Sequence, residues 1–305
     1  MPLLRANYIN HKGQYVSFGT GEGLFLNEHD LRNYCWNVQT RGNRIISVNR
    51  RGVQERSLPA IIAAQTEERA KELADKLFSV CEADLLENQK GLFEVNGYRL
   101  RCFVRGQDYS EWSKTPRSLK ISMKVIYDSI WYKTLDPITF GNGYIPIPVP
   151  IEQPQDVGAS PAGGSAVESW TGGEKGYFHG YPYDYPSTLD EYVFENNTGG
   201  PLSWQATIFG AASVITFDIG SHTYAVPDVT LADGDRLEIT AKESLDEKTV
   251  IKIAVDGTRT NCFAHRSTTS YLFEPIPAGI HTIRSANDLT WRLTPIIERS
   301  TPSWL

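Results

Sequence analysis

Thr66-Glu-Glu-Arg-Ala-Lys-Glu-Leu-Ala-Asp-Lys-Leu-Phe-Ser-Val-Cys-Glu-Ala-Asp-Leu-Leu86 is the one stretch with a long helical period. Its apolar residues fall on a single stripe: Ala70, Leu73, Ala74, Leu77, Phe78, Cys81 and Leu85. Thr66 is the expected N-cap, and Glu67 and Glu68 suit the positive end of the helix dipole. Gly91 is expected to end the helix in a left-handed conformation. This stretch therefore predicts one amphipathic helix that packs on a sheet.

The segment that follows, Gly91-Leu-Phe-Glu-Val-Asn-Gly-Tyr-Arg-Leu100, predicts a β-hairpin. Asn96 and Gly97 favour a type I′ turn, because both tolerate positive φ and the turn matches the twist of paired strands. On the second arm, apolar and basic residues alternate: Tyr98, Leu100, Cys102 and Val104 against Arg99, Arg101 and Arg105. A further strand over 119–127 also has one apolar face, so the region should form a sheet with one wet, basic side.

Shorter β-type runs lie before the helix, at Tyr15–Phe18, Arg44–Val48 and Ser57–Ala63, and the first nine residues resemble the start of a strand rather than a secretion signal. Together with the helix and the hairpin they predict a β-rich domain over residues 1–140.

Residues 141–176 contain eight Gly and five Pro, including Ile145-Pro-Ile-Pro-Val-Pro150. Each proline fixes φ and restrains the residue before it, so this stretch should run extended. We interpret residues 141–186 as a linker or arm between two domains.

Beyond the linker, short strands recur at close intervals, which is typical of an antiparallel sandwich over residues 187–305. The expected strands are Tyr192–Glu195, Trp204–Ile208, Val214–Ile219, Thr223–Val226, Arg236–Thr240, Thr249–Val255, Ser270–Phe273, His281–Arg284 and Leu289–Thr294. Turns are expected at Asp233-Gly234 and Asp256-Gly257. The predicted fold class is mainly β, with one long helix.

Composition and charge argue against several classes of function. The chain of 305 residues has a net charge of −6, with 19 basic and 15 acidic residues in 1–130 but 11 and 21 in 131–305. An acidic protein lacks the concentrated basic face of a nucleic-acid reader. The sequence has no run of about 18 apolar residues, so it predicts no membrane span. The cysteines Cys35, Cys81, Cys102 and Cys262 lack the paired spacing of a zinc site, so buried free thiols in a reducing cytoplasm are expected.

No motif for catalysis, metal binding or cofactor binding emerges. Gly19-Thr-Gly-Glu-Gly23 is not followed by a helix start, so a turn between strands is expected instead of a phosphate loop. Asp233-Gly-Asp235 lacks the other ligands of a calcium loop. There is no Gly-x-Ser-x-Gly elbow and no His-Glu-x-x-His. We therefore predict no enzyme activity, no catalytic or metal-binding residue and no cofactor.

An aromatic cluster is the strongest remaining local feature, with Tyr177, Phe178, Tyr181, Tyr183 and Tyr185 within nine residues. It fits two interpretations. Exposed rings would form a platform for carbohydrate, whereas buried rings with bonded hydroxyls would form a seam between domains. The flanking Pro182 and Pro186 make a stiff connector and favour the seam.

The order of these elements resembles the siphophage distal tail proteins. The resemblance rests on Asp30-Leu31, Trp36-Asn37-Val38, residues 53–63, the helix, the hairpin, Tyr181-Pro-Tyr-Asp-Tyr185, Phe273-Glu-Pro-Ile-Pro-Ala-Gly279 and Arg299-Ser-Thr-Pro-Ser-Trp-Leu305. It covers most of the chain apart from residues 141–176, and the order of elements carries it, since no single motif is diagnostic.

That resemblance implies a hexameric ring at the tip of a phage tail, in a virion assembled in the bacterial cytoplasm. The N-terminal domains would join the tail tube protein to the baseplate or receptor-binding proteins, and DNA would pass through the channel without specific binding. A galectin-like sandwich would project outward. Receptor or carbohydrate binding through that sandwich is the alternative function, and a tail-associated hydrolase is a third.

We place the subunit contacts, as a hypothesis, on the hairpin and the strands beside it, because unpaired strand edges can join across subunits. The residues concerned are Leu92, Val95, Asn96, Gly97, Arg99 and Arg101.

Overall fold

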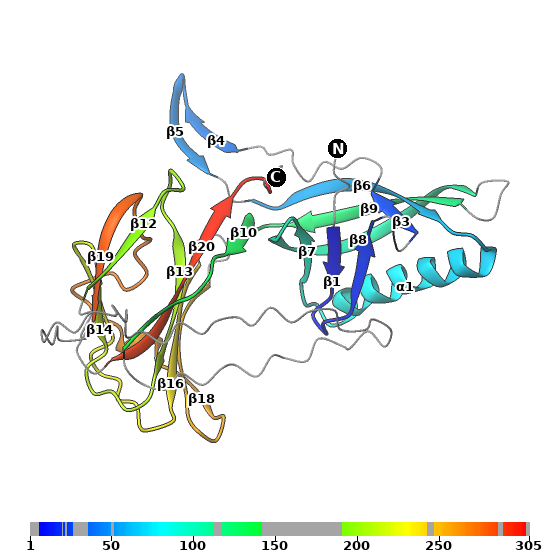
Figure 1. The fold of residues 1–305 in the computed structure, drawn as a ribbon. Coiled ribbons are helices and arrows are strands. Elements are labelled where there is room, and N and C mark those ends of the chain that lie inside the picture. Colours follow the sequence, from blue (N-terminus) through cyan, green and yellow to red (C-terminus); the bar gives the residue numbers. More distant parts are fainter. Residues whose placement is uncertain are drawn as a thin grey trace, which may run out of the picture. The chain divides into compact units, whose positions relative to one another are not determined.

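The computed structural model describes residues 6–19, 21, 23–26, 36–49, 52–112, 118–141, 191–242, 247–285 and 289–302. The chain folds into two compact units. The first comprises residues 1–135, 242–247 and 296–305, and the second comprises 136–241 and 248–295. The described part is mainly β with a single α-helix, which confirms the predicted fold class (Figure 1). Apart from Gly141, the predicted linker, including all five clustered aromatics, lies outside the described residues.

The helix α1 spans Glu67–Leu86, as predicted. Thr66 is its N-cap, and its hydroxyl oxygen accepts a hydrogen bond from the Arg69 backbone N–H at 3.2 Å. The predicted role of Gly91 is wrong. Asn88, with φ of 51°, is the left-handed residue after the helix, and Gly91 begins the next strand. Asparagine tolerates this conformation because its short polar side chain can bond locally.

The predicted apolar stripe of α1 is partly wrong. Ala70, Leu73, Leu77 and Cys81 are buried, but Phe78 and Leu85 are exposed. Val80 and the charged Asp84 are buried in their place. The buried face is therefore rotated relative to the most apolar face, because Asp84 is satisfied by hydrogen bonds that the sequence pattern does not reveal.

The predicted hairpin is confirmed. β7 (Gly91–Val95) and β8 (Tyr98–Trp112) pair with Val95 opposite Tyr98, and the turn residues Asn96 and Gly97 have φ of 52° and 77°. β1 (Ala6–Ile9) pairs with the outer edge of β7, and β2 (Tyr15–Phe18) pairs with β1. On the other side, β10 (Trp131–Thr134) pairs with β8 and with the C-terminal end of β20 (Thr290–Arg299).

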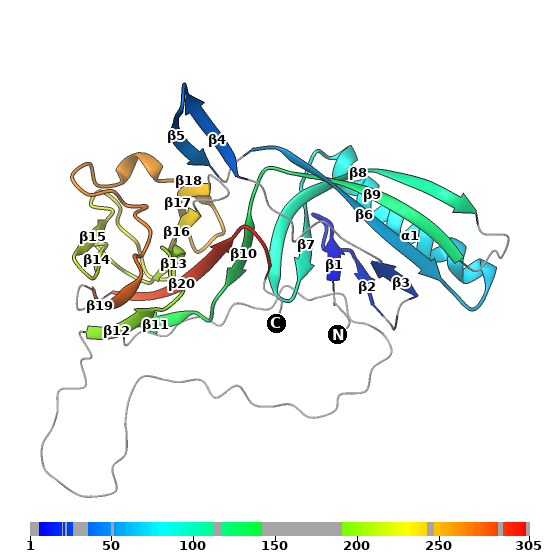
Figure 2. The same ribbon diagram turned by 90° about the horizontal axis from the view of Figure 1, so that it is seen from above.

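The long strand β8 belongs to two sheet surfaces. Its first half pairs with β7, and from Phe103 onward it pairs with β9 (Ser118–Tyr127), with irregularities after Val104 and Tyr109. β9 pairs with β6 (Gln54–Ala63), and β6 with β3 (Leu24–Leu26), so that β8, β9 and β6 run side by side (Figure 2). β-Bulges bend a strand in this way and increase its twist.

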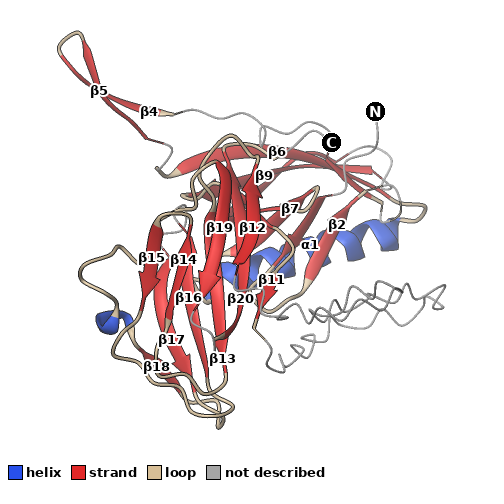
Figure 3. Cartoon of the chain, turned by 60° about the vertical axis from the view of Figure 1, so that its left-hand side comes forward, coloured by secondary structure: helices blue, strands red, loops and turns tan. Residues whose placement is uncertain are grey.

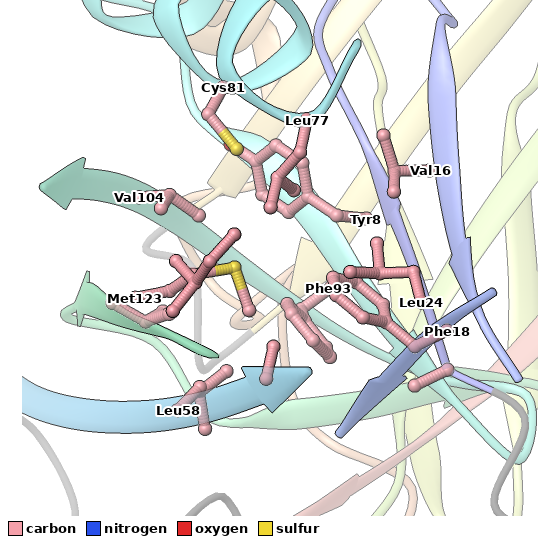
Figure 4. Close-up of a cluster of buried hydrophobic side chains, with 14 of the residues drawn as sticks. Tyr8, Val16, Phe18, Leu24, Leu58, Leu77, Cys81, Phe93, Val104 and Met123 are labelled. Atoms are coloured by element: carbon pink, nitrogen blue, oxygen red, sulfur yellow. The ribbon is translucent and has the colours of Figure 1, made fainter. Parts of the chain in front are cut away.

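The core of the first unit lies between these strands and α1 (Figure 4). Phe93 is fully buried and stacks on Phe18 with ring centroids 5.7 Å apart. Leu77 from the helix and Met123 from β9 are also fully buried. Each such side chain contributes about 1.5–3 kcal/mol relative to an exposed one.

β4 (Asn37–Arg41) and β5 (Arg44–Asn49) form a separate two-stranded sheet (Figure 3). Gly42 and Asn43 make the turn, with φ of 58° at Gly42. Among the described strands, β4 and β5 pair only with each other.

The second unit is a sandwich of two antiparallel sheets. One has the order β18 (Arg259–Asn261), β17 (Glu247–Ile253), β16 (Arg236–Lys242), β13 (Ser203–Phe209) and β20, with β11 (Ile138–Phe140) also paired to β20. The other has the order β12 (Glu191–Asn196), β19 (Gly279–Ser285), β14 (Thr216–Ile219) and β15 (His222–Ala225). This arrangement confirms the antiparallel β prediction for the unit.

Aromatic rings from both sheets meet in the sandwich core. Trp204 and Trp291 come from one sheet, and Phe217 and Tyr224 come from the other. Phe217 stacks on Trp291 with a centroid distance of 4.4 Å, and Trp204 meets Tyr224 edge-on at 5.1 Å. The predicted strand Ser270–Phe273 is wrong: this segment forms a bend and a turn, in which Leu272 and Phe273 are buried. β17 also ends at Ile253, which leaves Val255 exposed.

Candidate functional site

The metal-ligating and thiol groups of the described residues are dispersed or buried. Among the described residues, no group of three or more His, Cys, Asp or Glu side chains could hold a metal ion. Cys81, Cys102 and Cys262 are buried free thiols, as predicted, and burial raises the pKa of Cys81 to about 12, while Cys35 lies outside the described residues. A thiol whose pKa lies this far above neutral pH stays protonated and is a poor nucleophile. No helix in the described part is long and apolar enough to cross a membrane.

Both sequence motifs that superficially resemble ligand loops serve as turns. Gly19 and Leu24 form a bridge between β2 and β3, and the strand β3 begins directly after Gly23. Asp235 accepts a hydrogen bond from the Ala232 N–H at 3.1 Å and forms an ion pair with Lys252 at 2.9 Å. The carboxylate of Asp235 is thus used inside the fold.

The predicted contact residues of the β7–β8 hairpin lie in different environments. Val95 is fully buried in the core, whereas Asn96 and Gly97 are exposed at the turn. Arg99 is exposed and forms an ion pair with Glu94 at 2.9 Å. The Arg101 side chain is partly buried. Their role in an interface stays a prediction.

Both outer edges of this hairpin are paired within the chain. β1 covers β7 from Leu92 to Val95, and β10 pairs with β8 at Arg99. The hairpin therefore offers no free strand edge at these residues, and its exposed part is the turn at Asn96 and Gly97.

The β4–β5 hairpin has the features of an assembly surface, and we call it the arm hairpin (residues 37–49). Its large apolar side chains are all at least half exposed: Val38 50%, Ile45 66%, Ile46 61% and Val48 50%. Val38 is paired with Val48, so these two share one face. The register shifts at Ile46, which has no residue opposite it between the Gln39–Ser47 and Thr40–Ile45 pairs. An isolated two-stranded hairpin is marginal in water and gains stability when a third strand or a further layer covers it.

The polar groups of the arm hairpin also suit a partner surface. On the face opposite Val38, the Ser47 hydroxyl donates to the Gln39 side-chain oxygen at 3.1 Å, which ties the strands together. Arg41 and Arg44 flank the turn and give the tip two positive charges. The outer backbone edges of β4 and β5 are unpaired among the described strands. An apolar face, a basic tip and two open edges together form a surface that favours association.

A second exposed apolar set lies on α1. Phe78 is 49% exposed, Leu85 42% and Leu86 77%. Asp75 and Glu82 lie near these residues along the helix and carry negative charge. The first unit thus has two different surfaces, one apolar and basic and one apolar and acidic.

The C-terminal end of α1 is fixed to β1 by a buried carboxylate. Asp84 accepts hydrogen bonds from the Tyr8 hydroxyl at 2.6 Å and from the His11 backbone N–H at 2.8 Å. Burial, with the Asp84 bond among the smaller causes, raises the pKa of Tyr8 far above its usual value, so the hydroxyl stays a donor. This network shapes the helix surface, and nothing in it resembles a catalytic site.

The sequence contains a signal for the arm hairpin that the strand prediction at 44–48 did not use. Gly42 and Asn43 form a two-residue turn of the type that joins hairpin strands. The sequence has no signal that the apolar residues of the arm hairpin are exposed, because buried and exposed strands can have the same residue types.

No protein-family model and no curated protein matches the chain. Among solved structures, a chain of the phage P2 baseplate in its activated conformation with calcium is similar, with a TM-score of 0.57 and 10% identity over 99% of this chain and 100% of that one. A chain of the same baseplate with strontium gives a TM-score of 0.55 and 10% identity over 98% and 100%.

The Dit protein of phage SPP1 is also similar, with a TM-score of 0.55 and 8% identity over 97% of this chain and 99% of that one. That protein is described as a paradigm of the hub adsorption apparatus in phages that infect Gram-positive bacteria. At these identities the likeness shows a shared fold along the whole chain.

Proposed function

We propose that this protein is a structural component of a phage tail tip, a distal tail protein that forms a hub in the baseplate. The observation that carries the proposal is the extent of the fold match. The match includes both units, since each comparison covers at least 97% of this chain and 99% of the other. A fold is shared among unrelated functions, so the surface features must support the role as well.

The arm hairpin supports a role in assembly. Its exposed valines and isoleucines are costly to leave in water, at about 25 cal/mol for each Å² of apolar surface. A second copy of the chain can cover them. The α1 set of Phe78, Leu85 and Leu86 supplies a different apolar surface of opposite charge. Contact between two different surfaces is heterologous and closes into a ring when the rotation between copies is suitable.

We further propose that six copies form this ring, with the second unit as a galectin-like sandwich. The tail tube protein and the baseplate or receptor-binding proteins would be its partners, and DNA would pass through the channel without specific binding. The virion tail would be its location, after assembly in the host cytoplasm.

The mass of the purified full-length protein tests the ring. Light scattering should give a closed oligomer for the wild type, and Ile46→Glu should shift it toward monomer because a buried charge opposes association. Val255→Glu is the matched control, since Val255 is 72% exposed and belongs to the second unit. A wild-type protein that stays monomeric when mixed with its tail neighbours would overturn the proposal, whereas an Ile46→Glu oligomer of unchanged mass would place the subunit contacts outside the arm hairpin.

A further inference from the structure

An open groove of about 400 Å³ lies along β17 and β18 in the second unit. Small-molecule sites commonly have volumes of about 300–1,000 Å³. The residues that line it are Lys248, Thr249, Ile251, Arg259, Thr260, Asn261 and Phe263. None of them belongs to the assembly surfaces of the first unit.

Strand register brings the groove residues together. Ile251 is paired with Asn261, and Ile253 with Arg259, so Ile251, Asn261 and Arg259 project on one face of the sheet. The Cys262 N–H donates to the Val250 carbonyl at 2.8 Å and ends the pairing. The chain then enters the 3-10 helix η3 (Phe263–His265), which places Phe263 at the groove.

The apolar wall of the groove is held in a fixed position. Phe263 stacks on Phe273 with centroids 5.5 Å apart and planes at 18°. The Arg266 guanidinium carbon lies 4.2 Å from the Phe263 ring centroid. The Phe263 N–H also donates to the Asn261 side-chain oxygen at 2.9 Å. Phe263 and Ile251 thus form a preorganised apolar wall beside polar side chains.

The groove carries positive charge in the acidic half of the chain. Arg259 lies 3.6 Å from Glu238, but Arg236 also pairs with that same carboxylate at 3.2 Å. One negative charge is therefore shared by two guanidinium groups. Lys248 adds an ammonium group, which lies 2.8 Å from the Tyr271 hydroxyl. No Asp or Glu is found among the described residues that line the groove.

These features select a class of ligand. Guanidinium and ammonium groups bind carboxylate or phosphate, and guanidinium does so with two parallel hydrogen bonds. The Asn261 amide nitrogen can donate to an alcohol group, since the Asn261 oxygen already accepts from the Phe263 N–H. Ile251 and Phe263 suit a flat carbon–hydrogen face. We propose that the groove binds a sugar that bears a carboxylate or a phosphate group. This binding is independent of the assembly role proposed above.

Three sugars with the same ring test the proposal on the full-length protein: glucuronate, glucose 6-phosphate and glucose, each titrated at low salt and followed by ligand-observed NMR. At least one anionic sugar should bind about tenfold more tightly than glucose, and the tighter of the two identifies the acid group. Inorganic phosphate is the fourth probe. If it binds as tightly as the tighter of the two anionic sugars, or if glucose binds as tightly as both anionic sugars, the proposal is overturned.

Arg259→Gln should weaken binding of the tighter sugar about tenfold, because it removes one charge-assisted contact and the side chain is too exposed to affect folding. Arg284→Gln is the matched control, with the same change of charge on β19 of the opposite sheet. It should leave the affinity unchanged. Equal affinities of Arg259→Gln and the wild type would also overturn the assignment of the groove.

Discussion

His11 Nδ1 lies 2.6 Å from Oδ1 of Asp84, whose side chain is fully buried. His11 Nε2 lies 2.9 Å from Glu87, which also pairs with Lys12. The hydrogen bond to Asp84 is the largest cause that raises the pKa of His11, and Glu87 acts in the same direction. The imidazolium form therefore ties the β1–β2 turn to the C-terminal end of α1.

The first prediction concerns pH. A histidine whose pKa is higher in the folded than in the unfolded state stabilises the fold when it is protonated. This stabilisation is complete below the unfolded pKa of about 6.5 and is lost as pH rises through the folded pKa. The melting temperature should therefore fall above pH 6.5. His11→Gln should melt lower at pH 5.5 and show a weaker pH dependence, as measured by thermal unfolding from pH 5.5 to 8.5. His265→Gln, at an exposed position, should retain the wild-type dependence. Identical profiles for His11→Gln and the wild type would exclude this role for His11.

The second prediction concerns the close approach of β7 to this network. A Cβ at Gly91 would lie 2.6 Å from the Tyr8 hydroxyl oxygen and would collide with the Asp84 carboxylate. Gly91→Ala should therefore cost about 1–3 kcal/mol of unfolding free energy, as overpacking in cores does. Gly19→Ala is the control, because nothing lies within 4 Å of its added Cβ. Denaturant unfolding measures both, and equal stabilities of the two variants would contradict the geometry.

The third prediction concerns the sandwich core. The Trp204 indole N–H and the Tyr224 hydroxyl both donate to the Glu274 carbonyl, at 2.8 Å and 3.0 Å. Tyr224→Phe leaves that carbonyl satisfied by Trp204, so it should cost only about 0.5–1.5 kcal/mol. Trp204→Ala also opens a cavity and should cost about 3–5 kcal/mol. Urea unfolding compares the variants, and a larger loss for Tyr224→Phe than for Trp204→Ala would show that the shared carbonyl is misassigned.

Local signals predicted those elements whose sequence preferences agree with their burial. Asn96 and Gly97 define the β7–β8 turn through their own backbone, and Thr66 starts α1 through a side-chain hydrogen bond to a residue three positions along. The alternation of Leu289, Trp291 and Leu293 likewise predicted a strand. β20 begins at Thr290, and all three side chains are buried.

Long-range contacts account for the failures. Asp84 is buried only because Tyr8 and His11, more than 70 residues away, donate to it. Phe273 is buried in a turn by stacking on Phe263, although its segment resembles a strand. The candidate assembly surface depends on Ile45 and Ile46 being exposed, and hydrophobic patterning predicts burial for such residues.

The last prediction concerns the arm hairpin in solution. Among the described strands it pairs only with itself, so in a free subunit its amides should exchange with solvent close to the unprotected rate. In an assembled ring, contact with a second copy should slow exchange of residues 37–49 by about tenfold or more. Hydrogen exchange followed by mass spectrometry compares the wild-type oligomer with the Ile46→Glu monomer. Strands β13 and β16 of the second unit are the internal control, because they pair with each other from Trp204 to Phe209 in every copy and their protection should not change. If the wild type is an oligomer and the arm hairpin still exchanges as fast as in the monomer, the subunits are held together elsewhere. The exposed turn at Asn96 and Gly97 would then be the next surface to test.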